Sequence, residues 1–291
     1  MLRKIQYYLV TTKNLENGLW FRDDEDYKVG MNLVAQLTVL IGVRVLAFIL
    51  MSNHVHFVLQ CTDEQAISFI TSLKERYSRH VRRKYGIGEL LRRNQVEISR
   101  IAAENESLEK AIAYVMMNPV AANICLNAWA YAWGSGDCFF RSTPVKGIPL
   151  DSFSQRKRFS ILRTRQDIPS SGLLLNELGY VDPASYVVVR QVENIFRTPR
   201  RMNFFLVNSS KAKRRIESES DAPAFRDHVV AAGVGDLCQS LFHSPVLEDL
   251  EEAQQSEVLK QVRFRFSANV HQLARTSGLS YERVAYLLDL V

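Results

Sequence analysis

Hydrophobic and polar residues follow two different periods in the first 120 positions, which predicts a mixed α and β domain. Short runs rich in β-branched and aromatic residues predict strands at 9–12, 43–50, 53–60 and 96–101. Helical periodicity occurs instead at 27–40, 66–85 and 108–117. Only Met51 and Ser52 separate the second and third predicted strands, so we expect these two strands to form a hairpin.

The predicted order of elements is strand, helix, strand, strand, helix, strand, helix. This is the order of a ferredoxin-like split βαβ fold with one added helix. We therefore expect residues 1–141 to form an α+β domain with an antiparallel sheet. Pro144 and the Gly147-Ile148-Pro149 segment indicate a linker after it. Residues 142–255 form a mixed region without an assigned role, and the C-terminal region is mainly helical.

The last segment, 256–291, contains a possible helix-turn-helix between Ser267 and Leu290. Asn269 and Ser280 are good N-caps for two short helices, and Gly278 suits the turn between them. In this interpretation Arg283 faces a DNA groove. A small helical bundle that only closes the C-terminal domain explains the same pattern and remains open.

Composition narrows the class of protein and of partner. The 291 residues include 37 Lys and Arg against 31 Asp and Glu, a net charge of +6 that favours a polyanionic partner without naming one. No two of the four cysteines have C-x-x-C spacing, which argues against a thiolate zinc site and for reduced thiols in a cytoplasmic protein. The sequence predicts no signal peptide and no membrane partner.

The segment Asn53-His54-Val55-His56-Phe57 carries the first candidate chemistry. Residues two apart on a strand share a face, so His54 and His56 would present two imidazoles side by side. Two neutral imidazoles on rigid backbone are half of a divalent-metal site. A histidine pair on a solvated strand face is the alternative that this motif alone leaves open.

The predicted helix at 108–117 adds a nucleophile and a third ligand. Tyr114 and Asn118 are four residues apart and share a helix face. Asn118 can offer a carbonyl oxygen to a hard cation, and Tyr114 a phenolic oxygen for attack on a phosphodiester. Two imidazoles alone would favour zinc, whereas the Asn118 carbonyl favours Mg²⁺ or Mn²⁺, and we expect one of the latter two.

The predicted helix at 66–85 and the loop after it hold the densest basic cluster in the chain, interleaved with tyrosine. Phosphate contacts combined with base stacking suit single-stranded DNA. The expected DNA-binding residues, besides Arg283, are Lys74, Arg76, Tyr77, Arg79, Arg82, Arg83, Lys84, Arg92 and Arg93. A solvated basic helix face is the alternative.

Together, the His54-Val55-His56 strand and the later Tyr114-Val115-Met116-Met117-Asn118-Pro119-Val120 segment resemble the HUH transposases with one catalytic tyrosine, and most of all the REP-associated tyrosine transposases. The resemblance covers about the first half of the chain. It implies metal binding by His54 and His56, with Asn118 as third ligand, and a covalent 5′-phosphotyrosine at Tyr114. It also implies Mg²⁺ or Mn²⁺, hairpin-forming single-stranded DNA as substrate, no small-molecule cofactor, and a homodimer.

Two other functions remain as alternatives. A rolling-circle replication initiator or relaxase shares the HUH chemistry but commonly places its tyrosine elsewhere. A domesticated DNA-binding regulator would keep the fold without cleavage. A covalent adduct with DNA would distinguish an enzyme from such a regulator.

Overall fold

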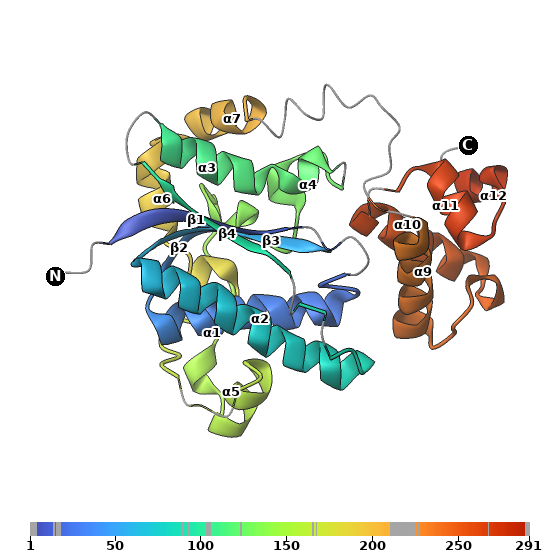
Figure 1. The fold of residues 1–291 in the computed structure, drawn as a ribbon, viewed down its shortest axis with the longest axis horizontal. Helices are drawn as coiled ribbons and strands as arrows, with labels where there is room; N and C mark the ends of the chain where they lie inside the picture. Colours follow the sequence, from blue (N-terminus) through green and yellow to red (C-terminus); the bar gives the residue numbers. More distant parts are fainter. Residues whose placement is uncertain are drawn as a thin grey trace.

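A four-stranded antiparallel sheet forms the centre of the N-terminal domain (Figure 1). The computed structural model describes residues 5–288 except 14, 16–18, 89, 92–93, 103–105, 123, 165, 167, 210–224, 226 and 267. The strands are β1 (Gln6–Thr12), β2 (Arg44–Met51), β3 (His54–Cys61) and β4 (Val96–Ile101), and their order in the sheet is β2-β3-β1-β4. β3 therefore lies between β1 and β2, and β1 lies between β3 and β4.

Two long helices connect these strands and cover one face of the sheet (Figure 1). They are α1 (Asp24–Ile41), which links β1 to β2, and α2 (Asp63–Tyr85), which links β3 to β4. Each begins at a side chain that accepts a backbone N–H, Asp23 for α1 and Thr62 for α2. The helices α3 (Ser107–Met116) and α4 (Asn118–Ala121) cover the opposite face. The ferredoxin-like split βαβ arrangement predicted from the sequence is confirmed.

The predicted hairpin is also present, with Met51 paired to His54 across a turn made by Ser52 and Asn53. Three elements, β1, α1 and α2, each begin three residues before the predicted start, and for α1 the first turn shows why. Asp23 caps that end, and Asp24, Glu25 and Asp26 occupy the first turn, where acidic side chains are stabilised by the helix dipole.

The core of this domain does not end at the predicted boundary, Arg141. Leu150, Val192, Phe196 and Leu206 are buried in the same hydrophobic cluster as the sheet. They belong to a segment with β5 (Ile148–Pro149), α5 (Gln155–Ile161), β6 (Leu174–Leu175), α6 (Val189–Phe196) and α7 (Pro199–Val207). The predicted linker at 144–149 contains strand β5, and the chain beyond it packs on the sheet and on α3.

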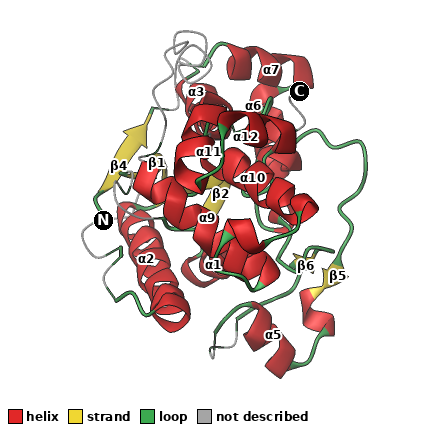
Figure 2. Cartoon of the chain, turned by 90° about the vertical axis from the view of Figure 1, so that its right-hand side faces the viewer, coloured by secondary structure: helices red, strands yellow, loops and turns green. Residues whose placement is uncertain are grey.

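The remaining helices enclose a second hydrophobic cluster (Figure 2). They are α9 (Asp227–Phe242), α10 (Glu252–Phe266), α11 (Val270–Ser277) and α12 (Tyr281–Leu287). α9 and α10 pack closely because Gly233 has no side chain: a Cβ there would lie 2.3 Å from Cζ of Phe266. We call α9–α12 the C-terminal unit. It starts about thirty residues before the predicted boundary at 256, since α9 supplies one wall of the cluster.

The C-terminal unit docks beside the β2–β3 turn. The Arg265 side chain is 4% exposed, donates to the backbone oxygen of Arg22 at 3.1 Å, and forms an ion pair with Asp24 at the start of α1. The hydroxyl of Ser52, in the turn itself, donates to the Arg265 backbone oxygen at 3.3 Å. Leu19 of the N-terminal domain is buried in the second cluster. In the part of the chain that the structure describes, no helix has both the length and the apolar character needed to cross a membrane.

We predict that Phe196→Ala destabilises the N-terminal domain by about 3–5 kcal/mol, because it empties a fully buried position in the shared cluster. Phe204→Ala is the matched control, since Phe204 lies on the neighbouring helix α7 and is 59% exposed; we expect its effect to stay within about 0.5 kcal/mol. Urea unfolding monitored by circular dichroism measures both. Equal stabilities would mean that residues beyond 141 do not belong to this core.

Candidate active site

His54 and His56 lie on β3 and face the side of the sheet that α3 and α4 cover. Their ring centroids are 4.8 Å apart with perpendicular planes. The His56 ring also meets the Tyr114 ring edge to face, with centroids 5.6 Å apart and an interplanar angle of 87°. The structure therefore brings together, from β3 and α3, the three residues on which the sequence analysis placed the chemistry.

Side-chain hydrogen bonds hold the histidine strand in place. The Thr12 hydroxyl accepts the backbone N–H of Val55 at 3.0 Å, next to both histidines. Asn53 Oδ1 lies 2.7 Å from Nδ1 of His54. When Nδ1 carries the proton and donates to Asn53, Nε2 holds the lone pair that a metal ion would need. In that tautomer Asn53 would leave Nε2 of His54 as the ligating nitrogen, a role that sequence reasoning had not assigned to Asn53.

A helix break at Pro119 fixes the orientation of Asn118. Pro119 has no backbone N–H, so the carbonyl of Val115 loses its usual helical donor. The side-chain amide nitrogen of Asn118 replaces it at 3.2 Å and also donates to the Tyr114 carbonyl at 2.9 Å. The helix consequently divides into α3 and α4 instead of continuing through Asn118. With its nitrogen committed to these carbonyls, Asn118 offers only its oxygen to a ligand.

These residues line one cavity of about 410 Å³. Its wall includes His54, His56, Tyr114 and Asn118, together with two residues that the sequence analysis missed, Lys13 and Glu97. The strand register explains the position of Glu97: Thr11 pairs with His56 on one side and with Glu97 on the other, so these side chains form a row on one face. A polar residue on the edge strand β4, in phase with this face, was the only signal in the sequence.

Comparison with known proteins identifies the first part of the chain. Residues 2–96 match the family described as Transposase IS200 like. This segment is similar in sequence to that family, and we call it the IS200-like segment. The match includes His54 and His56, and it ends before Tyr114 and Asn118. No curated protein and no solved structure matches the chain. The IS200-like segment supports a transposase-type function with DNA as the substrate.

The donor set of the cavity fits a divalent metal ion. Among the described residues, no group of three His, Cys, Asp or Glu side chains could hold a metal, so a third protein ligand must be of another kind. The Asn118 oxygen is such a donor, and carbonyl oxygen is a preferred ligand of Mg²⁺ and Mn²⁺. The IS200-like segment could therefore supply two ligands, and Asn118 at the start of α4 could supply the third.

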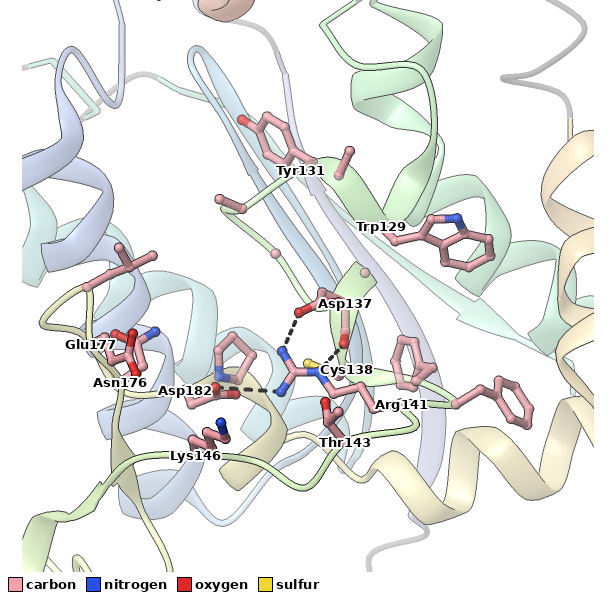
Figure 3. A pocket seen from close by; sticks show the side chains of 18 of the residues that line it. Trp129, Tyr131, Asp137, Cys138, Arg141, Thr143, Lys146, Asn176, Glu177 and Asp182 are labelled. Carbon is pink, nitrogen blue, oxygen red and sulfur yellow. Dashed lines mark hydrogen bonds and ion pairs between the residues drawn. The ribbon is translucent and has the colours of Figure 1, made fainter.

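A larger cavity, of about 800 Å³, lies away from these residues (Figure 3). Its most prominent cation, Arg141, is neutralised by Asp137 and Asp182, so it offers little attraction to a phosphate. Burial, followed by the nearby Asp182 carboxylate, raises the pKa of the Cys138 thiol and leaves it a poor nucleophile. We therefore place the chemistry in the smaller cavity.

The basic helix α2 is not the continuous DNA-binding face that the sequence predicted. Tyr77 is fully buried and its hydroxyl donates to the Trp20 carbonyl, so it cannot stack on a base. Burial also raises its pKa well above the usual value, so its phenol is a poorer nucleophile than that of an ordinary tyrosine. Lys74 donates to the Asn94 carbonyl, and Arg76 to the Gln36 side chain at 2.9 Å.

Three of the predicted DNA-binding residues on α2, Arg79, Arg82 and Arg83, are exposed. Arg92 and Arg93 lie outside the described residues.

Lys84 belongs to a cluster of carboxylates at the start of α1. Its ammonium contacts Asp23 at 2.6 Å, Asp26 at 3.1 Å and Glu25 at 3.3 Å. Burial alone would raise the pKa of Asp26, but the hydrogen bond from His80 and the charge of Lys84 outweigh it and lower that pKa. Carboxylates of the protein therefore balance the charge of Lys84, which leaves it less attractive to a DNA phosphate than an unpaired lysine.

In the C-terminal unit the predicted helix-turn-helix geometry is present. Asn269 and Ser280 cap α11 and α12, and Gly278 has φ 76° in the turn between them. The ends of the predicted segment, Ser267 and Leu290, lie outside the described residues. The DNA-reading interpretation stays a prediction: the Arg283 side chain is 38% exposed, but it is already paired within the unit. It forms an ion pair with Glu252 of α10 at 2.9 Å, because α12 packs this face against α10.

We predict that Lys84→Met lowers the free energy of unfolding by about 1–3 kcal/mol at neutral pH, because Asp23 and Asp26 lose their shared cation. The stability that Asp26 gains from its lowered pKa is present above the unfolded pKa, near 4, and disappears as the pH falls through the folded pKa. The difference between the variant and the natural protein should therefore shrink at about pH 3.

The matched control for this test is Arg82→Met, on the same turn of α2 with an exposed side chain, for which we expect a change within about 0.5 kcal/mol. Urea unfolding at both pH values gives the comparison. A loss for Arg82→Met as large as that for Lys84→Met would contradict the structural role of Lys84.

Proposed function

We propose that the protein is a single-tyrosine transposase-type nuclease that cleaves and rejoins single-stranded, hairpin-associated DNA through a covalent 5′-phosphotyrosine at Tyr114. The observation that carries the proposal is the edge-to-face contact of Tyr114 with His56 in a cavity that also contains His54 and Asn118. The IS200-like segment, which contains His54 and His56, supports the same class of reaction.

In this proposal Tyr114 is the nucleophile, and other residues of the cavity hold the metal ion. The Tyr114 oxygen attacks a backbone phosphorus, the bond from phosphorus to the 3′ oxygen breaks, and the 3′ oxygen leaves as a hydroxyl. The phosphotyrosine ester retains the bond energy, so the reverse attack by a 3′-hydroxyl rejoins a strand. His54, His56 and Asn118 would hold Mg²⁺ or Mn²⁺, which supplies charge neutralisation at the phosphate oxygens when bound.

A phenol has an ordinary pKa near 10, so Tyr114 needs a group that takes its proton during attack. Glu97 is the carboxylate in the wall of the cavity, on the same face of the sheet as His56. We assign Glu97 as this proton acceptor. Lys13, an exposed cation in the same wall, is placed to bind a phosphate next to the one that reacts.

The homodimer implied by the resemblance stays a prediction. A DNA-binding regulator with the same fold would keep the affinity for hairpin DNA and form no covalent adduct, so the experiment on Tyr114 decides between the two functions.

We predict that Tyr114→Phe abolishes the covalent adduct with a single-stranded hairpin oligonucleotide and leaves its affinity nearly unchanged, because the phenol supplies the nucleophile while phosphate contacts supply binding. A denaturing gel of protein, oligonucleotide and Mn²⁺ measures the adduct, and fluorescence anisotropy measures the affinity. Tyr281→Phe, at an exposed position of α12, is the control and should form the adduct normally. An adduct that persists in Tyr114→Phe would assign the nucleophile to another residue.

We predict that Glu97→Gln slows adduct formation by a factor of about 10²–10⁴ with little change in DNA affinity, because glutamine keeps the shape of the side chain but accepts no proton. Single-turnover kinetics on the same oligonucleotide give the rate. Glu75→Gln, an exposed change on α2 across the sheet, should leave the rate unchanged. If the two variants react equally fast, Glu97 takes no part in the proton transfer.

A further inference from the structure

A second cavity, of about 510 Å³, is lined by the outer side of α1 and α2 and by the segment around α5. Four arginines contribute to its wall: Arg76, Arg79 and Arg83 from α2, and Arg163 from the turn after α5. We call this cavity the arginine groove. It shares no lining residue with the cavity that contains Tyr114. Its α5 wall lies outside the IS200-like segment.

We propose that the arginine groove binds the phosphodiester backbone of DNA as a second contact, separate from the catalytic cavity. The inference rests on the proposed function only in taking DNA as the ligand.

The charges around the groove favour an anion. The only carboxylate paired with one of its arginines in the described contacts is Glu25, which lies 3.0 Å from Arg163 and is shared with Lys84. Asp26 is fully buried and does not line the groove; its carboxylate pairs with His80 at 2.6 Å. Burial, and then the charge of Arg79, lower the pKa of Arg76. Cations that destabilise one another in this way gain free energy when a phosphate joins them.

A buried glutamine builds the wall of the groove in advance. Gln36, on α1, is fully buried, and its side-chain oxygen accepts from Arg76 at 2.9 Å. Its amide nitrogen donates to the Leu162 carbonyl at 3.4 Å, just after α5. The neighbouring Asn32 donates to the Ile161 carbonyl at 3.0 Å. These bonds fix Arg76 and the α5 segment relative to each other, so Arg76 loses little further freedom on binding.

The position of the groove indicates a long ligand. It lies on the outer side of the α1–α2 layer, whereas Tyr114 lies on the face of the sheet covered by α3 (Figure 1). With layers about 10 Å apart, the two sites are separated by roughly 20 Å. One nucleotide cannot reach both, but a strand or hairpin stem with a phosphate at every step can. A polymer of phosphates therefore explains the groove better than a single small anion.

The test is the double variant Arg79→Ala/Arg163→Ala, in which both changed side chains are exposed. Its affinity for hairpin DNA is measured by fluorescence anisotropy in EDTA, between about 50 and 200 mM salt. We expect weaker binding and a slope of log K against log salt that is smaller by about 2, one for each lost phosphate contact.

The matched control is Arg200→Ala/Arg263→Ala, which removes the same charge from exposed positions on α7 and α10 and should keep the natural slope. Thermal unfolding of both variants checks that they are folded. A groove variant with the natural affinity and slope overturns the proposal. A second outcome also overturns it: the groove variant binds DNA normally, but inorganic phosphate no longer raises its unfolding temperature. The ligand of the groove is then a small anion. Since binding is measured without metal, failure of the Tyr114 chemistry would leave this result unaffected.

Discussion

The pairing of β3 on both of its edges is the constraint on which the catalytic cavity depends. β1 and β2 hold β3 between them, and Thr12 adds a side-chain bond next to the histidines. A shift of one residue in this register would turn His54 and His56 to the face that α1 and α2 cover. The same register places Glu97 in line with His56 through Thr11. The register of three neighbouring strands can therefore bring the two histidines and Glu97 to one face of the sheet, without a loop.

The second half of the cavity depends on a broken helix. Pro119 removes a backbone donor, and the Asn118 amide satisfies the carbonyls of Tyr114 and Val115 in its place. This arrangement links the nucleophile and the third ligand physically, since the side chain that would coordinate a metal also bonds to the residue that would attack. A substitution at Asn118 is thus expected to disturb the Tyr114 backbone as well as the ligand set.

The segments beyond the IS200-like match complete the domain and enlarge its surface. α6 and α7 close the core over α3, and α5 supplies one wall of the arginine groove. The C-terminal unit docks through Arg265 next to the β2–β3 turn, and Phe225, just before α9, lines the catalytic cavity. Because Arg265 is buried at this contact, a mutation that removes its partner Asp24 would leave an unpaired charge between the two parts.

The sequence by itself determined the elements and half of the site. Periodicity located the strands and helices, H-x-H spacing put His54 and His56 on one strand face, and cap residues such as Asn269 and Ser280 located the short C-terminal helices. Tertiary structure alone decided which polar side chains are buried or paired within the protein and which remain exposed. Tyr77 and Lys84 looked like DNA contacts, but packing against α1 buries one and pairs the other with carboxylates. Glu97 joined the site only through strand register, and Arg163 joined the groove through a return of the chain across more than seventy residues. Local pattern sets which way a side chain points along its own element, whereas its neighbours come from segments that are distant in sequence.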